Sequence, residues 1–229
     1  VGIRVFIDGA WGFSSTSDLN QPALEKALKQ AIECAKSLSQ LKKSNLKNLP
    51  QTKLARGDFK IPGYENLKNM PLEQKLHAVL KAEELTRNNS ALIHSATCVY
   101  NEIFEDKIVV TTDGANASSQ LARNEFKIGA IASKDGEMAE SHESVGRTGS
   151  WECLFSRTTL NEMSDSAAKL AVDLLSAPKI PGGNTVLILS PAMVGLLSHE
   201  AIGHTVEADF VLSGSVAQGK LGTLVASPL

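Results

Sequence analysis

One stretch near the C-terminal end of the chain carries residue types that can hold and use a metal ion. It contains His199, Glu200 and His204 in the order His-Glu-x-x-x-His. Zinc takes imidazole nitrogens and carboxylate oxygens as ligands, and a carboxylate beside the ion can accept a proton from water. Chance would give this order only about 0.008 times in a chain of this composition. The pattern therefore favours a metal site over coincidence.

The spacing of the two histidines is one residue longer than in the His-Glu-x-x-His zinc motif. In a regular α-helix, His199 and His204 would lie about 140° apart around the axis and about 7.5 Å apart along it. Either long side chains close this gap or the backbone loosens. Gly203 favours loosening, because a single π-turn brings residues i and i+5 onto one face. The alternative is a wet helix face that carries two unrelated histidines.

The residues before this motif predict a helix that directly follows a short buried strand. Ser190 is a good N-cap, and Pro191 suits the first helical position. The apolar residues that follow supply a helix face. Just upstream, residues 185–189 (TVLIL) predict a short buried strand that runs directly into the helix.

The rest of the chain predicts an α+β fold, with antiparallel sheets, helices packed on one face of them, and the metal-motif helix near the C-terminus. Trp11 and Phe13 are expected to pack the first sheet against the first helix, with a pocket lining as the weaker alternative. The expected elements are a hairpin over 1–15, helices from Asp18 or Asn20 to about Ser39, over 71–88 and over 159–176, and strands over 91–104, 108–112, 118–133 and 137–145.

Four regions follow from this pattern. Residues 1–40 end an N-terminal α/β segment, and 41–70 form a linker or long loop, because basic residues alternate there with Pro and Gly. Residues 71–178 combine a helix, an antiparallel meander and a second helix. Residues 179–229 begin a truncated metal-binding domain, and the chain is expected to be a fragment of a longer protein.

The sequence also predicts two turns, three outward histidines and the core stripes of two helices. Glu105-Asp106-Lys107 is expected to turn between two strands, and Asp113-Gly114-Ala115-Asn116 to form the next turn. His77, His94 and His142 are expected to be outward polar residues. The expected core stripes are Leu72, Leu76, Val79, Leu80 and Leu85 on one helix and Leu160, Met163, Ala167, Leu170, Ala171 and Leu174 on the other.

Composition limits the class of protein. The formal net charge is −2 and aromatic residues make up 5% of the chain, so a nucleic-acid surface is not expected. No apolar run is long enough to cross a membrane. Cys34, Cys98 and Cys153 are widely spaced and odd in number, which is typical of reduced thiols in a cytoplasmic protein.

Three runs of residues resemble the TldD/PmbA family, known as modulators of DNA gyrase. They are LLSHEAIGHTVEAD at 196–209, VGIRVFIDGAWGFSST at 1–16 and LGTLVAS at 221–227. The His-Glu-x-x-x-His motif makes the chain similar to the metal-bearing TldD type rather than to the metal-free PmbA type. The resemblance implies a zinc-dependent peptidase that cuts peptides or unfolded segments. It also implies a PmbA-type partner subunit, or assembly as a homo-oligomer.

The resemblance also assigns roles to residues. By position, His199 and His204 would be zinc ligands and Glu200 the catalytic acid–base. The third ligand would be a cysteine from a C-terminal half that this chain lacks, so the fragment alone is expected to be inactive. Glu207 and Asp209 either orient the histidines or are solvated charges.

Two other functions remain open from the sequence. The chain could be a catalytically silent scaffold or binding subunit of a heteromeric protease assembly. It could also modulate nucleic-acid structure, as the family's older label suggests, although the weak acidity argues against this.

Overall fold

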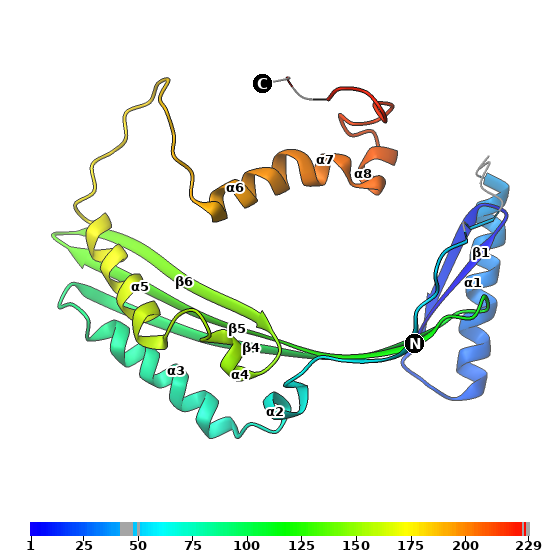
Figure 1. The fold of residues 1–229 in the computed structure, drawn as a ribbon, viewed down its shortest axis with the longest axis horizontal. Coiled ribbons are helices and arrows are strands. Elements are labelled where there is room, and N and C mark those ends of the chain that lie inside the picture. Colours follow the sequence, from blue (N-terminus) through cyan, green and yellow to red (C-terminus); the bar gives the residue numbers. More distant parts are fainter. Residues whose placement is uncertain (42–47, 50, 226, 228–229) are drawn as a thin grey trace. The chain divides into compact units, whose positions relative to one another are not determined.

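The computed structural model describes residues 1–41, 48–49, 51–225 and 227 of the chain. They divide into two compact units, Val1–Ser176 and Ala177–Leu229. The first unit holds two sheets and most of the helices, whereas the described part of the second unit holds short helices and turns (Figure 1). The α+β class expected from the sequence is confirmed.

The chain begins with a β-hairpin, as expected. Strands β1 (Gly2–Ile7) and β2 (Ala10–Ser15) pair antiparallel around Asp8 and Gly9, which both take positive φ. This is the backbone that a tight two-residue hairpin turn requires. Helix α1 (Gln21–Leu41) follows, and the Asn20 side chain caps it by accepting a hydrogen bond from the Ala23 amide at 3.0 Å.

The expected packing of Trp11 and Phe13 against α1 is wrong. Alternate residues of β2 face the helix, and these are Ala10 and Gly12, which are buried. A Cβ on Gly12 would lie 1.9 Å from the Ala31 carbonyl oxygen, so helix and strand touch backbone to backbone. The two aromatic side chains therefore project from the other face, 45% and 59% exposed.

A four-stranded sheet forms the centre of the first unit. Strand β5 (Asn116–Lys134) pairs antiparallel with β4 (Ile93–Val110) on one side. On its other side it pairs antiparallel with β6 (Glu137–Thr148) and parallel with the short β3 (Arg56–Lys60). The sheet is thus antiparallel, as expected, apart from β3.

The turn predicted at residues 105–107 is wrong, because β4 runs through it without a break. Asp106 lies opposite Gln120 in the regular register. Its carboxylate accepts hydrogen bonds of 2.7 Å from the Tyr64 hydroxyl and the Gln120 amide. These two hydrogen bonds satisfy the carboxylate of Asp106, the charged group that suggested a turn. The chain reverses instead at Gly114, whose φ is 107°, within the turn expected at 113–116.

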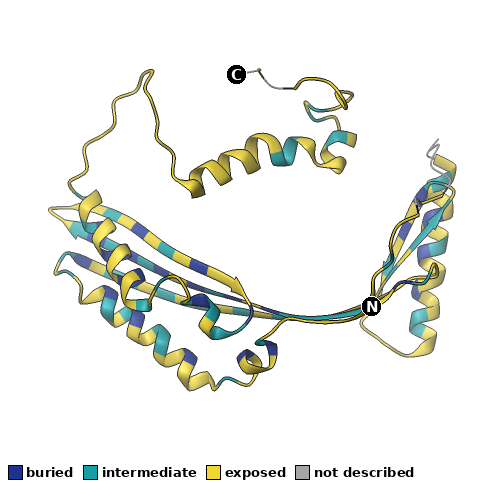
Figure 2. Cartoon of the chain, in the orientation of Figure 1, coloured by how far each residue is buried: buried dark blue, intermediate teal, exposed yellow. Residues whose placement is uncertain are grey.

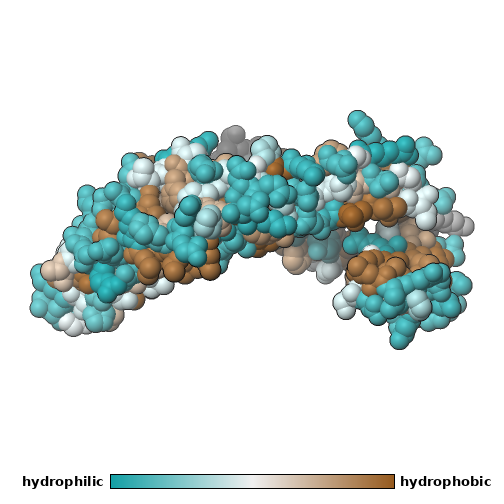
Figure 3. All heavy atoms as spheres, turned by 90° about the horizontal axis from the view of Figure 1, so that it is seen from below, coloured by the Kyte–Doolittle hydropathy of each residue, from teal (hydrophilic) through white to brown (hydrophobic). Residues whose placement is uncertain are grey.

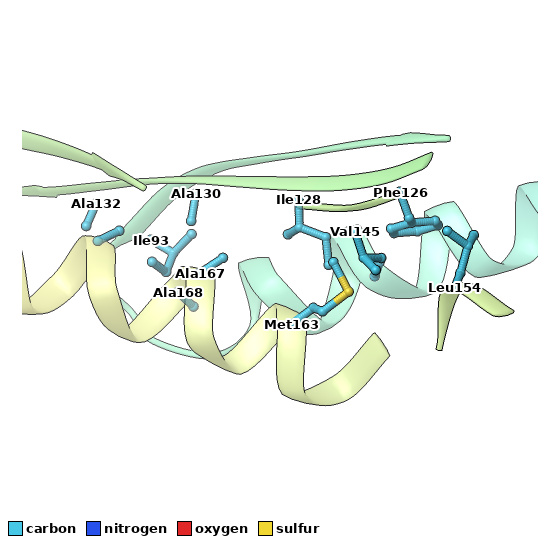
Figure 4. Packing of buried hydrophobic residues seen from close by; sticks show 12 residues of the cluster. Ile93, Phe126, Ile128, Ala130, Ala132, Val145, Leu154, Met163, Ala167 and Ala168 are labelled. Atoms are coloured by element: carbon cyan, nitrogen blue, oxygen red, sulfur yellow. The ribbon is translucent and has the colours of Figure 1, made fainter. Parts of the chain in front are cut away.

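Helices α3 (Leu72–Arg87) and α5 (Leu160–Leu174) cover one face of this sheet (Figure 1). Buried and less buried residues alternate along β5, as a sheet with one covered face requires (Figure 2). The core between sheet and helices is shown in Figure 4 and includes Ile93, Phe126, Ile128, Ala130, Ala132, Val145, Leu154, Met163, Ala167 and Ala168.

The helix stripes expected in this core are only partly correct. Met163, Ala167 and Ala171 of α5 are buried, but Leu170 and Leu174 are exposed. On α3, Leu72, Leu76 and Leu80 are exposed, and the buried residues are Lys75, Ala82 and Thr86. The buried residues of α5 are mostly small, and on α3 the buried Lys75 reaches Glu102 of β4, so the leucines of both helices lie on their outer sides.

The loop expected at 41–70 contains regular structure. It includes β3 and the short helix α2 (Tyr64–Lys68), whose Tyr64 and Leu67 are buried; residues 42–47 and 50 lie outside the described part of the chain. The Tyr64 ring meets Phe104 of β4 edge-on at 5.5 Å. A further short helix, α4 (Trp151–Leu154), joins β6 to α5 and contributes to the core.

The buried strand predicted at 185–189 is wrong. The structure assigns no strand to these residues, and Val186 and Ile188 are 92% and 99% exposed. A strand is defined by its pairing, and no described segment pairs with this one. Among the helices of the described residues, none has both the length and the hydrophobicity to cross a membrane.

Candidate metal centre

The second unit presents the predicted metal motif on one interrupted helix. Helix α6 (Pro191–Ser198) begins as expected, with the Met193 amide donating to the Ser190 hydroxyl at 3.3 Å and Pro191 in the first turn. It continues into a single π-turn, η1 (His199–Gly203), and then into α7 (His204–Val206). The motif therefore starts where the regular helix ends.

The π-turn solves the spacing problem posed by the sequence. The His204 amide donates to the carbonyl of His199, five residues earlier, instead of to the residue four earlier. Each turn thus holds one more residue, so positions i and i+5 come onto the same face. The sequence left two possibilities open, and the structure has the second one: the backbone loosens into a π-turn.

The three motif side chains converge. His199, Glu200 and His204 each offer a ligand atom, and these atoms lie within 4.8 Å of one another. The two imidazole rings are 4.3 Å apart at their centroids and inclined by 77°. Tetrahedral ligands at about 2.0–2.1 Å from zinc lie about 3.4 Å apart, so small side-chain rotations would suffice. Two nitrogens beside a carboxylate oxygen form a donor set that suits zinc.

Glu207 lies against His204. Its Oε1 is 3.0 Å from Nδ1 of His204, which is the distance of an ion pair. The contact does not have the angle of a hydrogen bond, and Nδ1 is buried without a hydrogen-bond partner among the described residues. The backbone of Glu207 leaves the helix at ψ 134°, so α7 ends just before it. With Nδ1 covered in this way, Nε2 is the nitrogen of His204 left for an ion.

Asp209 is placed differently from Glu207. Its carboxylate accepts a hydrogen bond of 2.9 Å from the Phe210 amide at the start of α8 (Ala208–Leu212). It is not a member of the group of candidate ligands found among the described residues. Asp209 therefore stabilises the beginning of α8 in this structure.

Two residues that the sequence did not single out support the motif. The Phe210 ring meets the His204 ring edge-on at 5.9 Å. The Thr205 hydroxyl donates to the Ile202 carbonyl at 3.0 Å, and the Thr205 carbonyl accepts from the Ser215 hydroxyl at 2.8 Å. These contacts hold the end of the helix and the chain after α8 close to the π-turn. The residues that make these contacts lie outside the His-Glu-x-x-x-His motif, and no pattern in the sequence indicated the contacts.

The other candidate residues lie apart from this group. His77, His94 and His142 are exposed on α3, β4 and β6, as expected. Cys34, Cys98 and Cys153 are free, and none belongs to the candidate ligand group among the described residues. Burial raises the pKa of the Cys98 thiol to about 11, with the Glu83 charge adding to the effect. Because zinc binds the thiolate, Cys98 is a poor ligand.

Two histidines and a glutamate converging on one helix define a site of the kind that zinc peptidases carry. Sequence profiles of the PmbA/TldA metallopeptidase domain 1 and central domain match residues 1–35 and 65–175. Together with the relatives below, these matches show that the chain belongs to the PmbA/TldD family. The metal motif lies beyond both matched segments.

Relatives with metalloprotease names align along almost the whole chain. A metalloprotease of Methanocaldococcus jannaschii is 26% identical over 99% of the chain, and a TldD homologue of Haemophilus influenzae is 25% identical over all of it. A zinc metalloprotease TldD homologue of Saccharolobus solfataricus is 23% identical over 93%. These alignments cover 49%, 48% and 45% of the relatives, so the chain spans about half their length.

Two solved structures share the fold. One, from Bacteroides thetaiotaomicron, has a TM-score of 0.76 at 16% identity and covers 99% of this chain and 51% of its own. The other, from Thermotoga maritima, has a TM-score of 0.67 at 22% identity and covers 97% and 48%. Both are named as modulators of DNA gyrase.

Proposed function

We propose that this chain belongs to a zinc-dependent peptidase of the TldD type, which cuts peptides or unfolded segments. The observation that carries this proposal is the π-turn that brings His199, Glu200 and His204 within reach of one ion. The names of the aligned relatives support a zinc metallopeptidase. The three cysteines, none of them in a disulfide, support a cytoplasmic location.

The two histidines would hold the ion in this proposal, with His204 binding through Nε2. Catalytic zinc usually has three protein ligands. Two histidines hold it weakly, so we propose that a cysteine in the C-terminal half of a longer polypeptide completes the set, as the family resemblance implies. Glu207 would fix the ring of His204 through its contact with Nδ1. For Asp209, the structure supports a role in starting α8 rather than beside the ion.

Glu200 would act as the acid–base. When bound, zinc supplies Lewis acidity, which makes water a better nucleophile near neutral pH and polarises a peptide carbonyl. The Glu200 carboxylate lies beside the two imidazoles, within reach of a water molecule held there. It would accept a proton from the attacking water and return that proton to the leaving amine.

Metal content and peptide cleavage in the complete gene product test this proposal. Glu200→Gln should retain zinc, measured by elemental analysis, and lower the cleavage rate by about 10²–10⁴-fold. His204→Ala should lose zinc as well as activity. His142→Ala changes an exposed histidine far along the sequence and should change neither.

The alternative of a silent scaffold or binding subunit predicts a different result. In that case the gene product would cleave no peptide at any zinc concentration, with or without a PmbA-type partner subunit or a second copy of itself. Cleavage that persists at full rate in Glu200→Gln would show that another group transfers the proton. Either result would contradict the assignment of Glu200.

A further inference from the structure

Among the described residues, the outer strands β4 and β6 of the four-stranded sheet each pair on one side only, and β4 is the longer of the two. Strand β5 uses both of its sides, but β4 pairs only with β5. Among the described residues, no strand pairs with the other side of β4, which extends over 18 residues. An unpaired edge presents a row of amide and carbonyl groups to any extended chain that can reach it. Such edges are usually shortened, charged or covered.

The helix layer under this edge is wider than the strands above it. Two packed helices about 8–10 Å apart, each about 10 Å across, cover a width of about 20 Å. Strands lie about 4.8 Å apart, so about four strands match that width. Over α3 and α5 the described sheet has β4, β5 and β6. Helix α5 packs on β5 and β6, and α3 packs mainly on β4, so the vacant strand position is above α3 at the β4 edge.

The surface of α3 beneath this position is apolar. Leu72, Leu76 and Leu80, here called the leucine stripe, are 73%, 52% and 58% exposed. Their spacing of four residues places them along one side of the helix. Figure 3 shows hydrophobic side chains gathered over the part of the surface that α3 occupies. A soluble helix face normally carries charges here, so the leucine stripe indicates a binding partner.

The leucine stripe lies on the β4 side of α3, away from α5. Lys75 of α3 reaches β4, where its Nζ is 2.8 Å from both carboxylate oxygens of Glu102. Ala82, in contrast, packs beside Ser164 of α5. On an ideal helix, Leu72, Leu76 and Leu80 lie about 60–140° beyond Lys75, in the direction leading away from Ala82. An added strand would therefore lie nearest Leu72 and Leu76.

An added strand would also contact residues of β4 on the sheet face opposite the helices. Val99 and Ile103 lie on the face opposite the helices and are 40% and 60% exposed. Side chains of a strand point alternately to the two faces of a sheet. An extended segment with apolar residues at successive positions would thus meet Val99 and Ile103 on one face and the leucine stripe on the other.

The geometry favours a single strand over a second copy of the chain. If β4 paired antiparallel with the β4 of another copy, the two α3 helices would lie on the same face of the sheet, below strands only about 4.8 Å apart. Packed helices need about 8–10 Å. Since α3 already extends below the vacant position, a second α3 would collide with it. A lone extended segment brings no helix.

We propose that the β4 edge and the leucine stripe bind an extended apolar segment of a polypeptide substrate as an additional strand. The choice of a substrate as the occupant rests on the proposed peptidase function. Backbone hydrogen bonds to β4 would supply affinity that is independent of sequence, and apolar contacts would favour segments normally buried in folded proteins. The site would thus select unfolded chains at a place other than the metal motif.

Binding of a labelled peptide to the complete gene product tests the proposal. The probe is a peptide of about ten residues that alternates valine and isoleucine, so that both of its faces are apolar, with lysines at its ends for solubility. Chelator and Glu200→Gln prevent cleavage, so the measurement does not depend on peptidase activity. We expect saturable binding by fluorescence anisotropy, and slower amide hydrogen exchange in residues 95–103 when the peptide is bound. A peptide with proline at every second position should not bind, because proline cannot donate to the edge.

A matched pair of variants identifies the surface. Leu76→Glu with Leu80→Glu should weaken binding by about tenfold or more, because charge replaces the apolar floor. Leu170→Glu with Leu174→Glu has the same spacing and similar exposure on α5, and should leave binding unchanged. Circular dichroism confirms that both variants fold.

Three results would overturn the proposal. The peptide could bind without slowing exchange in residues 95–103, or bind equally well to both variants. The edge could also be protected without peptide, which would show that a second copy, a partner subunit or another segment of the same polypeptide occupies it. If the gene product cleaves no peptide yet binds the probe at this edge, the peptidase proposal fails and the binding surface remains.

Discussion

The two units of this chain differ in what holds them together. The first unit has a continuous core in which Phe126, Ile128 and Leu154 are fully buried between sheet and helices. In the second unit, none of the helices α6, α7 and α8 has a buried residue. Its shape instead comes from the helix backbone, an N-cap and a few side-chain hydrogen bonds. Among the described residues, the side chains of the metal motif are therefore positioned by local interactions, whereas the first unit is stabilised by tertiary ones.

The largest expected effect comes from deleting a buried ring in the first unit. Phe126 is fully buried and contacts Phe155 edge-on at 5.7 Å. Phe126→Ala should lower the free energy of unfolding by about 3–5 kcal/mol, because it leaves a cavity. Phe210→Ala in the second unit removes a ring that is 49% exposed and should change the midpoint of denaturation little. Chemical denaturation followed by circular dichroism measures both. Equal effects would show that the second unit has a core of its own.

A buried charge in the first unit should have the next largest effect. Lys75 is 6% exposed and binds Glu102 and the Leu67 carbonyl. Lys75→Met should lower the free energy of unfolding by about 2 kcal/mol, since Glu102 loses its partner in a partly buried place. Adding Glu102→Leu should restore part of this loss. If the double variant is less stable than the single one by the full cost of a second independent change, the pair is not coupled.

The N-caps of α5 and α6 allow the two units to be compared by the same kind of substitution, with a smaller expected effect on stability. Thr159 caps α5 with a capping box, in which its hydroxyl accepts from the Glu162 amide at 3.1 Å and the Glu162 carboxylate accepts from the Thr159 amide at 2.7 Å. Thr159→Ala should cost the first unit about 1 kcal/mol of unfolding free energy. Ser190→Ala, at the cap of α6, should instead raise hydrogen exchange within α6 without moving the main unfolding transition. A shift of that transition by Ser190→Ala would mean that the two units unfold together.

The smallest effect is expected at Gly203. Its φ of −50° and ψ of −64° are open to any residue, and an added Cβ would be 3.7 Å from the Ser198 carbonyl oxygen. This is an ordinary contact, so Gly203→Ala should bind zinc within about twofold of the unchanged gene product. Isothermal titration with zinc measures it. A large loss would show that the π-turn depends on glycine at this position.

Much of this architecture could be predicted from short-range patterns. The hairpin at Asp8-Gly9, the N-cap at Ser190 and the strands β5 and β6 depend on neighbouring residues, and the structure has them. The π-turn was one of two possibilities, because a six-residue motif fixes which side chains must meet but not how. The roles of His199, Glu200 and His204 remain proposals that the metal measurements will test.

The errors all concern which partner a residue meets. Trp11, Leu76 and Leu80 have the spacing of core residues, but alanines and a glycine occupy the helix contacts and leave them exposed. Asp106 is of a residue type that favours turns, but it lies within β4, where the hydroxyl of Tyr64, distant in sequence, donates a hydrogen bond to it. Residues 185–189 have the composition of a buried strand but no described strand beside them.

By itself, the sequence determined the α+β class, because hydrophobic periodicity acts over a few residues. Short runs of residues determined the family resemblance and the side chains that could bind a metal. Only the tertiary structure decided that β4 is one long edge strand and that α3 turns its leucines outward beneath it. Those outcomes depend on distances between segments far apart in the chain, and close packing by small residues sets these distances.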